Sequence, residues 1–322
     1  MKVLVTGGAG YIGSVLVPML LALGHRVRVF DSLLHGGRSL MGVWSHPGFE
    51  FLRGDVCQGT SVESALRDIE AVVHLAAIVG DPACARQPDV AHAVNLEATL
   101  ALIEASRRQD VSRFVFASTC SNYGRMSEAE HYYVDETSEL RPVSLYAETK
   151  VAVEKAIMEH RGAGFCPTIL RFATVFGVSP RMRLDLTVNH FVAEMITKKR
   201  LLVFGEHFWR PYVHVRDAAN AVALVLNAAP AKVKGEVFNV GSTKENYRKL
   251  DLIELVRPYA PDVVVEYVQR KNDQRDYRVS FDKVEKALEF GIQHTVPDGI
   301  REVARLVRDG VVGDLDDKSL RN

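Results

Sequence analysis

The stretch KVLVTGGAGYIG, residues 2–13, decides the fold. An apolar segment of strand type runs into a glycine-rich turn, and a segment with helical spacing follows. Gly8, Gly10 and Gly13 match the pattern G-x-G-x-x-G, and Gly7 with the last two matches G-x-x-G-x-x-G. Such glycines permit a tight turn and let the backbone approach a pyrophosphate, while the helix N-terminus faces the phosphate charge. The stretch therefore predicts a dinucleotide site at Gly7, Gly10, Tyr11, Ile12 and Gly13.

Strands and helices alternate through the first half of the chain. The expected strands are 2–6, 26–30, 49–54, 71–76, 113–118 and 167–172, and the expected helices are 11–24, 60–67, 88–109 and 144–160. Continuous apolar strands separated by helices are typical of a parallel sheet covered on both faces. The sequence thus predicts an α/β fold of Rossmann type, with a doubly wound parallel sheet.

The regular alternation of strands and helices ends at about residue 175. Further helices are expected at 184–199, 216–227, 248–258, 282–289 and 297–308, with a strand at 236–240. We interpret residues 1–175 as the cofactor-binding domain, with returns to its sheet near 205–241. Residues 176–322 are interpreted mainly as a smaller, mixed α/β substrate lobe.

Composition excludes several classes of partner. The chain has 322 residues, with 40 Lys and Arg against 40 Asp and Glu, so its formal net charge is zero and no nucleic-acid or membrane partner is expected. No apolar run reaches transmembrane length. The cysteines show no CxxC pair and no metal-ligand spacing, so we expect reduced thiols, no metal and a cytoplasmic protein; they are Cys57, Cys84, Cys120 and Cys166.

Acidic residues follow the second and third strands. Asp31 ends the second strand, about 20 residues after the glycine turn, where a carboxylate accepts the ribose 2′-hydroxyl and repels a 2′-phosphate. This position favours NAD over NADP, unless Asp31 is only a solvated loop residue. Asp55 is a candidate for the adenine end of the cofactor or, equally, a strand-end loop residue.

Two polar features suggest proton-transfer chemistry. The stretch SLYAETKVAVEKA, residues 144–156, reads as a helix that carries Tyr146 and Lys150 on one face. Thr119 follows the fifth strand, whose carboxyl end should open onto the ligand crevice. A lysine can favour the phenolate of a neighbouring tyrosine. The alternative is an incidental surface pair.

Together these motifs resemble the extended short-chain dehydrogenase/reductases, and more narrowly their nucleotide-sugar epimerases and dehydratases of the UDP-glucose 4-epimerase type. The resemblance rests on TGGAGYIG, Asp31, HLAA at 74–77, ASTCSNYG at 117–124 and YAETK at 146–150. It implies that Tyr146 is the acid/base, Lys150 its partner and Thr119 the hydroxyl that orients the sugar. It also implies cofactor contacts at Asp55, Val56, Leu75, Ala76, Ala77, Asn95 and Lys150.

The resemblance implies substrate contacts as well. Arg210 in RPYVHVRD would reach the nucleotide, while His214 and Asp217 of the same motif look structural. Arg270 and Arg278 compete for the diphosphate. Further candidates are Asn189, through its helix start, and Tyr123, which is otherwise a core aromatic residue. Thr174 stands where the family usually has an asparagine that contacts the nucleotide sugar.

The residues after Thr119 bear on the reaction. Cys120, Ser121 and Asn122 stand where family dehydratases carry Asp-Glu, so 4,6-dehydration is not expected. The leading interpretation is a 4-epimerase that oxidises C4 transiently. The alternatives are a 4-dehydrogenase, for which GDP-heptose is a possible substrate, and a non-catalytic NAD-sensing regulator. A homodimer formed through helices 88–109 and 144–160 is expected by resemblance.

Overall fold

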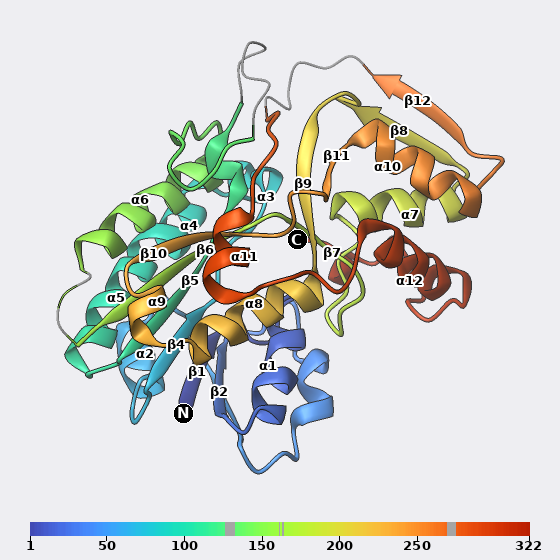
Figure 1. Cartoon of the computed structure of the whole chain (residues 1–322). Coiled ribbons are helices and arrows are strands. Elements are labelled where there is room, and N and C mark those ends of the chain that lie inside the picture. Colours follow the sequence, from blue (N-terminus) through green and yellow to red (C-terminus); the bar gives the residue numbers. More distant parts are fainter. Residues whose placement is uncertain (126–132, 161, 163, 269–274) are drawn as a thin grey trace.

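The computed structural model describes residues 1–125, 133–160, 162, 164–268 and 275–322. Its main feature is a seven-stranded sheet in the order β10-β6-β5-β4-β1-β2-β3 (Figure 1). Every pairing in this sheet is parallel. The predicted doubly wound α/β fold is therefore confirmed. The strands are β1 Lys2–Thr6, β2 Arg26–Asp31, β3 Phe49–Arg53, β4 Ala71–His74, β5 Arg113–Thr119, β6 Cys166–Phe172 and β10 Glu236–Val240.

Helices cover both faces of the sheet because its strands are apolar on both sides. Along β1, Val3 and Val5 pack into a core with α1 (Gly13–Ala22) and α8 (Val215–Asn227). Leu4, between them, points the other way, into a core built with other helices. Those helices are α2 (Gly59–Ala65), α5 (Ala98–Arg108) and α6 (Leu145–Glu159). Alternate residues of one strand thus serve two separate cores.

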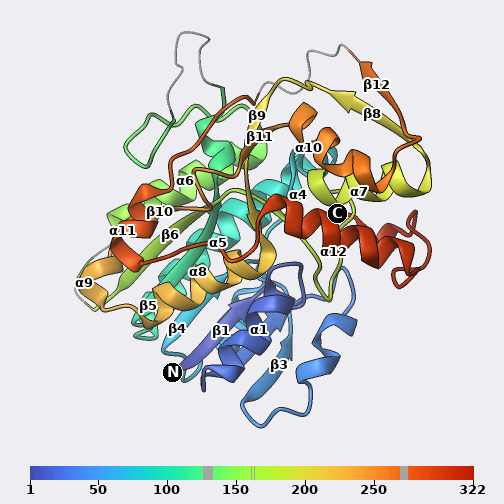
Figure 2. The same cartoon turned by 45° about the vertical axis from the view of Figure 1, so that its right-hand side comes forward.

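The second lobe is built around a third core and two small sheets (Figure 2). One sheet has the order β11-β9-β7 and the other pairs β12 with β8. The strands are β7 Thr174–Phe176, β8 Arg200–Phe204, β9 Trp209–His214, β11 Asn246–Arg248 and β12 Val264–Val268. The helices of this lobe include α7 Thr187–Thr197, α10 Lys249–Val256 and α12 Val296–Arg308. Residues 215–240 run back to the main sheet as α8, α9 (Pro230–Val233) and β10, followed later by α11 (Asp282–Leu288).

The segment expected as one helix over 88–109 is interrupted. It contains α4 (Pro88–His92), a π-helical turn over Ala93–Glu97, and α5. A short α3 (Asp81–Arg86) precedes it. Such wide turns often lie at functional sites. Here the π turn carries Asn95, whose side chain accepts from the Ile78 N–H at 2.8 Å and donates to the Ile78 carbonyl at 2.9 Å. No helix of the described residues is both long and apolar enough to cross a bilayer.

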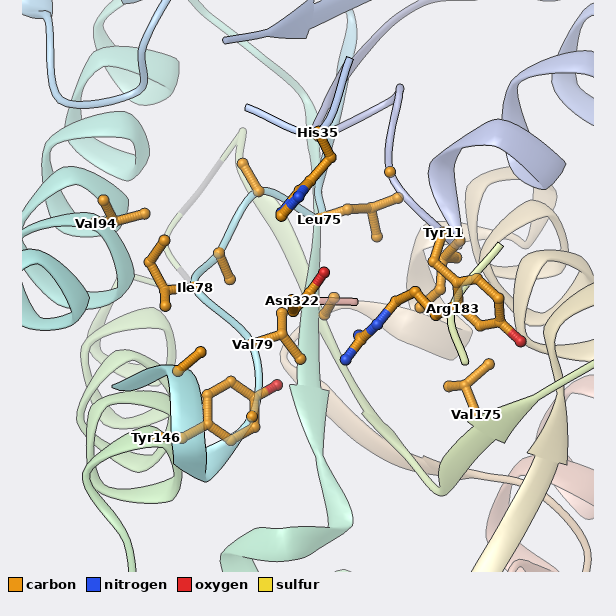
Figure 3. Close-up of a pocket in the computed structure, with 18 of the residues that line it drawn as sticks. Tyr11, His35, Leu75, Ile78, Val79, Val94, Tyr146, Val175, Arg183 and Asn322 are labelled. Atoms are coloured by element: carbon orange, nitrogen blue, oxygen red, sulfur yellow. The ribbon is translucent and has the colours of Figure 1, made fainter. Parts of the chain in front are cut away.

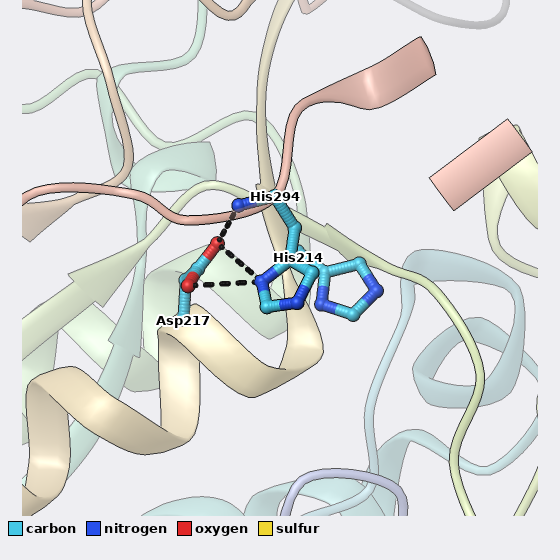
Figure 4. Close-up of side chains that lie close together, drawn as sticks. All are labelled: His214, Asp217 and His294. Atoms are coloured by element: carbon cyan, nitrogen blue, oxygen red, sulfur yellow. Dashed lines mark hydrogen bonds and ion pairs between the residues drawn. The ribbon is translucent and has the colours of Figure 1, made fainter. Parts of the chain in front are cut away.

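Hydrogen bonds from the buried Asp217 join α8 to the segment that leads into α12 (Figure 4). Asp217 accepts from the backbone N–H groups of Gln293 and His294 at 3.1 and 3.0 Å, and the His294 ring stacks on His214 at 4.5 Å. The side chains of His214, Asp217 and His294 lie close enough to share a metal ion. However, Asp217 already caps this segment, and the imidazole Nε2 of His214 bonds Glu302 at 2.7 Å. The hydrogen bonds give the motif a structural role.

Removal of this carboxylate should destabilise the fold. Asp217→Ala leaves two N–H groups without their acceptor, and we expect it to lower the free energy of unfolding by about 2–4 kcal/mol. Asp309→Ala, at an exposed carboxylate, is the matched control and should change it by less than about 0.5 kcal/mol. Chemical denaturation measures both. Equal stability of the two variants would contradict the structural role of Asp217.

Candidate active site

A cavity of about 960 Å³ opens at the carboxyl edge of the main sheet. Its wall combines the glycine turn, the ends of β2, β4, β5 and β6, the start of α6, and residues 181–187. In a parallel sheet the strand ends of one sign meet at a single edge, and ligands bind where the strand order reverses. Here the strand order reverses beside β1: β2 and β3 follow on one side of it, and β4 and the later strands lie on the other. Figure 3 shows the side chains that enter the cavity from these elements.

The glycine turn has the close geometry that a pyrophosphate cradle requires. Gly7 has a φ of +71°, and a Cβ there would lie 2.7 Å from the backbone nitrogen of Ala76. A Cβ on Gly13 would lie 2.5 Å from the Gly7 carbonyl oxygen. Helix α1 begins at Gly13 without a side-chain cap. The N–H groups of Ser14 and Leu16 already donate to the carbonyls of Gly10 and Ile12, so the donors that can meet a ligand are those just before them in the glycine turn. These residues fit a dinucleotide phosphate.

Asp31 lies in this cavity at the end of β2. Its carboxylate accepts from the Ala9 N–H at 3.0 Å and from the Leu33 N–H at 2.8 Å, which fixes its orientation beside the glycine turn. Burial raises the pKa of this carboxyl, while the two backbone hydrogen bonds lower it. Asp55 also lines the cavity, and its carboxylate accepts from the Cys57 N–H at 2.9 Å.

Most of the other predicted cofactor residues line the same cavity. These are Gly7, Gly10, Tyr11, Ile12, Gly13, Val56, Leu75, Ala76, Ala77 and Lys150. Asn95 is the exception, because it is buried behind the wall and acts through the backbone of Ile78. It therefore supports the loop that lines the cavity.

Helix α6 brings the predicted catalytic pair to the cavity. Ser144 caps the helix by accepting from the Ala147 N–H at 3.4 Å, and Tyr146 follows in the first turn. The Tyr146 hydroxyl points into the cavity, where the guanidinium of Arg183 enters from the opposite side (Figure 3). One turn later, the Lys150 ammonium donates to the Ala117 carbonyl at 2.8 Å and lies 4.6 Å from the centre of the Phe116 ring. Thr119 lines the cavity from the end of β5.

The electrostatics of this pair differ from the simple expectation of a lysine that acidifies a phenol. Burial raises the pKa of Tyr146 above its usual range; Cys84 and Asp81 raise it further, while Arg183 lowers it. Burial also lowers the pKa of Lys150 to about 8. The protein groups alone therefore keep Tyr146 neutral, so a further positive charge is required to make it a base at neutral pH.

A buried polar network lies beneath the cavity. Glu154 on α6 forms an ion pair with Arg171 on β6 at 2.6 Å, and both side chains are buried. The Tyr123 hydroxyl accepts from Arg171 at 3.0 Å and donates to Asn239 at 2.8 Å. The hydroxyl of Tyr123 is thus used inside the protein and its ring is not part of the cavity wall, which favours the alternative of a core aromatic residue over a substrate contact.

Other predicted substrate contacts also lie elsewhere. Asn189 is fully buried, and its amide bonds the backbone of Gly177 and the carbonyl of Arg183. Its side chain therefore acts inside the protein, and a diphosphate contact through its helix start stays a prediction. Arg210 lies over the Tyr277 ring, and Arg278 lies over the rings of Tyr133 and Trp209. Neither arginine is part of the cavity wall. Arg270 lies outside the described residues. Thr174 does line the cavity.

The sequence interpretation missed the arginines that do reach the cavity. The arginines that line it are Arg86, Arg181, Arg183, Arg275 and Arg321. Arg183 forms a bidentate pair with Asp185 at 2.5 and 3.0 Å, and Arg275 pairs with Asp81 at 3.1 Å. The available signal was SPRMRLDL, residues 179–186, where basic residues directly follow a strand that ends at the predicted crevice.

Comparison with known proteins agrees with this site. The model of the NAD dependent epimerase/dehydratase family matches residues 3–241, well over half of the chain. The chain belongs to this family. It is therefore an enzyme of the extended short-chain dehydrogenase/reductase type, and NAD is its cofactor. The predicted family and cofactor are confirmed.

Similar proteins differ in the reactions they are named for. The UDP-glucose 4-epimerase of Corynebacterium glutamicum is 29% identical over 315 residues, which cover 92% of each chain. The dTDP-glucose 4,6-dehydratase of an Actinoplanes species is 31% identical and covers 96% of this chain and 98% of its own. The crystal structure of Thermus thermophilus UDP-glucose 4-epimerase with NAD superposes with a TM-score of 0.84 at 30% identity, covering 96% of this chain and 99% of its own. These similarities establish the family and leave the reaction open.

Asp31 should select NAD over NADP. Asp31→Asn keeps the shape of the side chain but removes the charge that repels a 2′-phosphate and accepts the ribose hydroxyls. We expect the ratio of NAD to NADP affinity to fall on the order of 10-fold or more. Calorimetric titration of both nucleotides into the stripped protein measures this ratio. An unchanged ratio would show that Asp31 does not face the ribose.

Lys150 should leave a signature in the pH dependence of stability. Because its pKa in the folded protein is about 8, below its value in the unfolded chain, the folded state releases this proton first as the pH rises. The unfolded state then binds more protons, so wild-type stability should rise relative to Lys150→Met between about pH 8 and 10. Melting temperatures of the two cofactor-free proteins across this range test it. A difference that stays constant from pH 7 to 10 would refute the burial of a charged Lys150.

Proposed function

We propose that this enzyme is an NAD-dependent nucleotide-sugar 4-epimerase that works by transient oxidation at C4. The observation that supports this most directly is the placement of Tyr146, Thr119 and Lys150 in the same cavity as the glycine turn and Asp31. A hydroxyl base and a dinucleotide cradle thus share one space. This arrangement suits the removal of a hydride and a proton from one carbinol.

Each side chain has a defined part in the proposal. Tyr146 removes the proton of the C4 hydroxyl, and Thr119 holds the sugar oxygen for that transfer. NAD, when bound, supplies the hydride acceptor, and its positive ring adds the charge that the phenol needs to ionise. Lys150 is held by the carbonyl of Ala117 on β5 and lines the same cavity, where it is the partner of Tyr146. Return of the hydride to the opposite face of C4, together with return of the proton by Tyr146 to the same oxygen, would complete the cycle.

The segment after β5 argues against dehydration. Elimination of water across C5 and C6 needs a carboxyl group beside the sugar. Of residues 120–122, only Ser121 lines the cavity. Cys120 donates to the Arg171 carbonyl, and Asn122 donates to Glu154 at 2.8 Å, so both face the interior. Of the carboxylates that line the cavity, Asp81 is paired with Arg275 and Asp185 with Arg183, while Asp31 and Asp55 follow β2 and β3 at the cofactor end. The reaction that remains is reversible hydride transfer.

The substrate must be held differently from the usual pattern of the family. Thr174 supplies a hydroxyl in the cavity wall where an asparagine amide is usual. Arg183, oriented by Asp185, is the cation that faces Tyr146 across the cavity and is therefore our candidate for the sugar diphosphate. The homodimer and the division at residue 175 stay predictions.

The test is turnover of a panel of nucleotide sugars, with products separated by chromatography. A 4-epimerase gives the C4 epimer without lasting absorbance from NADH, whereas a 4-dehydrogenase gives stoichiometric NADH. Release of a dehydrated sugar would contradict the proposal.

Tyr146→Phe should abolish this turnover. Removal of the phenolic oxygen removes the only proposed proton acceptor, and we expect kcat to fall on the order of 10³-fold or more. NAD binding should persist, because the phenyl ring of the variant still occupies the place of the Tyr146 ring in the cavity wall. Tyr267→Phe, an exposed tyrosine of β12, is the control and should keep full activity. Residual activity of Tyr146→Phe near the wild-type level would show that another group moves the proton.

A further inference from the structure

The loop after β7 is fastened to the first turn of α1. The Tyr11 hydroxyl donates to the Gly177 carbonyl at 2.6 Å. Ser179 donates to the Tyr11 carbonyl at 2.7 Å, and its hydroxyl lies 2.9 Å from that of Ser14. Residues 177–179 are therefore fixed against the helix N-terminus that faces the cofactor phosphate. Arg181, only two residues further on, lines the cavity beside this turn.

Arg181 is a buried cation that forms no direct ion pair with a carboxylate of the described residues, although the Asp185 charge acts on it from a distance. Its side chain is 6% exposed, and Nη2 donates to the Arg321 carbonyl at 3.0 Å. Among the described residues, neither Nε nor Nη1 has a hydrogen-bond partner. Its neighbour Arg183, by contrast, has Asp185 as a bidentate partner. A guanidinium is costly to bury without an acceptor, so this site is incomplete without an anion.

The surroundings place this cation on the cofactor side of the cavity. His35 lies in the loop that follows Asp31, and its ring enters the cavity (Figure 3). Burial, followed by the charges of Arg181 and Arg183, lowers the pKa of His35 to about 4. Arg181 is thus close to a loop from β2 and to the first turn of α1. Both elements belong to the part of the cavity that holds Asp31 and the glycine turn, where the pyrophosphate of a dinucleotide would be held.

We propose that Arg181 binds the pyrophosphate of NAD from the side opposite the glycine turn, as part of a roof formed by residues 177–186 and Arg321. The glycine turn before α1 contributes backbone N–H groups on one side of the pyrophosphate, and Arg181 contributes two charged donors on the other. The roof is held by the Ser179 and Tyr11 bonds, so it is in place before the cofactor binds. For a 4-epimerase, on the proposed function, such a roof would retain the reduced cofactor between the two hydride transfers.

The test measures nucleotide binding and needs no turnover, so it does not depend on the sugar chemistry. Arg181→Met keeps the apolar stem and removes both donors. We expect it to weaken NAD and ADP-ribose, which both carry the pyrophosphate, by a similar factor on the order of 10- to 100-fold. Adenosine, which lacks phosphate, should bind unchanged. Arg305→Met, whose side chain is 84% exposed on α12, is the matched control and should bind all three ligands normally.

Thermal melting separates a binding role from a structural one. Without cofactor, Arg181→Met should melt at the wild-type temperature or higher, because it removes an unbalanced buried charge. Its rise in melting temperature on addition of NAD should be smaller than that of the wild type. For Arg181→Lys, the rise in melting temperature on addition of NAD should lie between those of the wild type and Arg181→Met, because this variant keeps the charge but not the two donors.

Two results would overturn the proposal. Unchanged binding of NAD and ADP-ribose to Arg181→Met would exclude a pyrophosphate contact. A loss confined to UDP-glucose or another nucleotide sugar would assign Arg181 to the diphosphate of the substrate instead. If no nucleotide sugar is epimerised by the wild type, the proposed function fails, while the cofactor result stands by itself.

Discussion

The active site depends on one buried ion pair that fixes helix α6 against the sheet. Tyr146, Lys150 and Glu154 are spaced four residues apart and so share a face of the helix. Glu154 is held by Arg171 of β6 and by the hydroxyl of Ser118 of β5. Removal of one partner of such a pair is costly because the other charge remains buried. This anchor sets the rotation of α6 and directs Tyr146 into the cavity.

A second constraint joins the two lobes at the cofactor turn. Tyr11 follows the glycine motif in sequence, yet its hydroxyl bonds Gly177, at the start of the loop that carries the cavity arginines. Asn189 supports the same carbonyl from α7, at 3.2 Å, which explains why its amide is not free for substrate. Cofactor turn and arginine loop are thus a single rigid unit. Cofactor and substrate contacts are built on it together.

The sequence predicted those parts of the site that local chain geometry determines. The glycine turn, Asp31 and the Tyr146–Lys150 pair follow from strand ends and helix spacing, and all lie in one cavity. Long-range packing could not be read in this way. Tyr123 and Asn189 face the interior because they form hydrogen bonds with Asn239 and with Gly177, respectively. Arg181 enters the cavity because Ser179 bonds its loop to the turn before α1. The raised pKa of Tyr146 follows from burial, which a sequence does not display.

We propose that one hydride leaves C4 of a nucleotide sugar and returns to the same carbon while the cofactor stays in the cavity. A nucleotide sugar that carries deuterium at C4 tests this most directly, with mass spectrometry and NMR of the epimer formed. We expect the C4 epimer to keep its deuterium at C4, because the cofactor stays bound between the two transfers. Loss of the label to solvent, or its appearance in released cofactor with a 4-keto sugar, would contradict it.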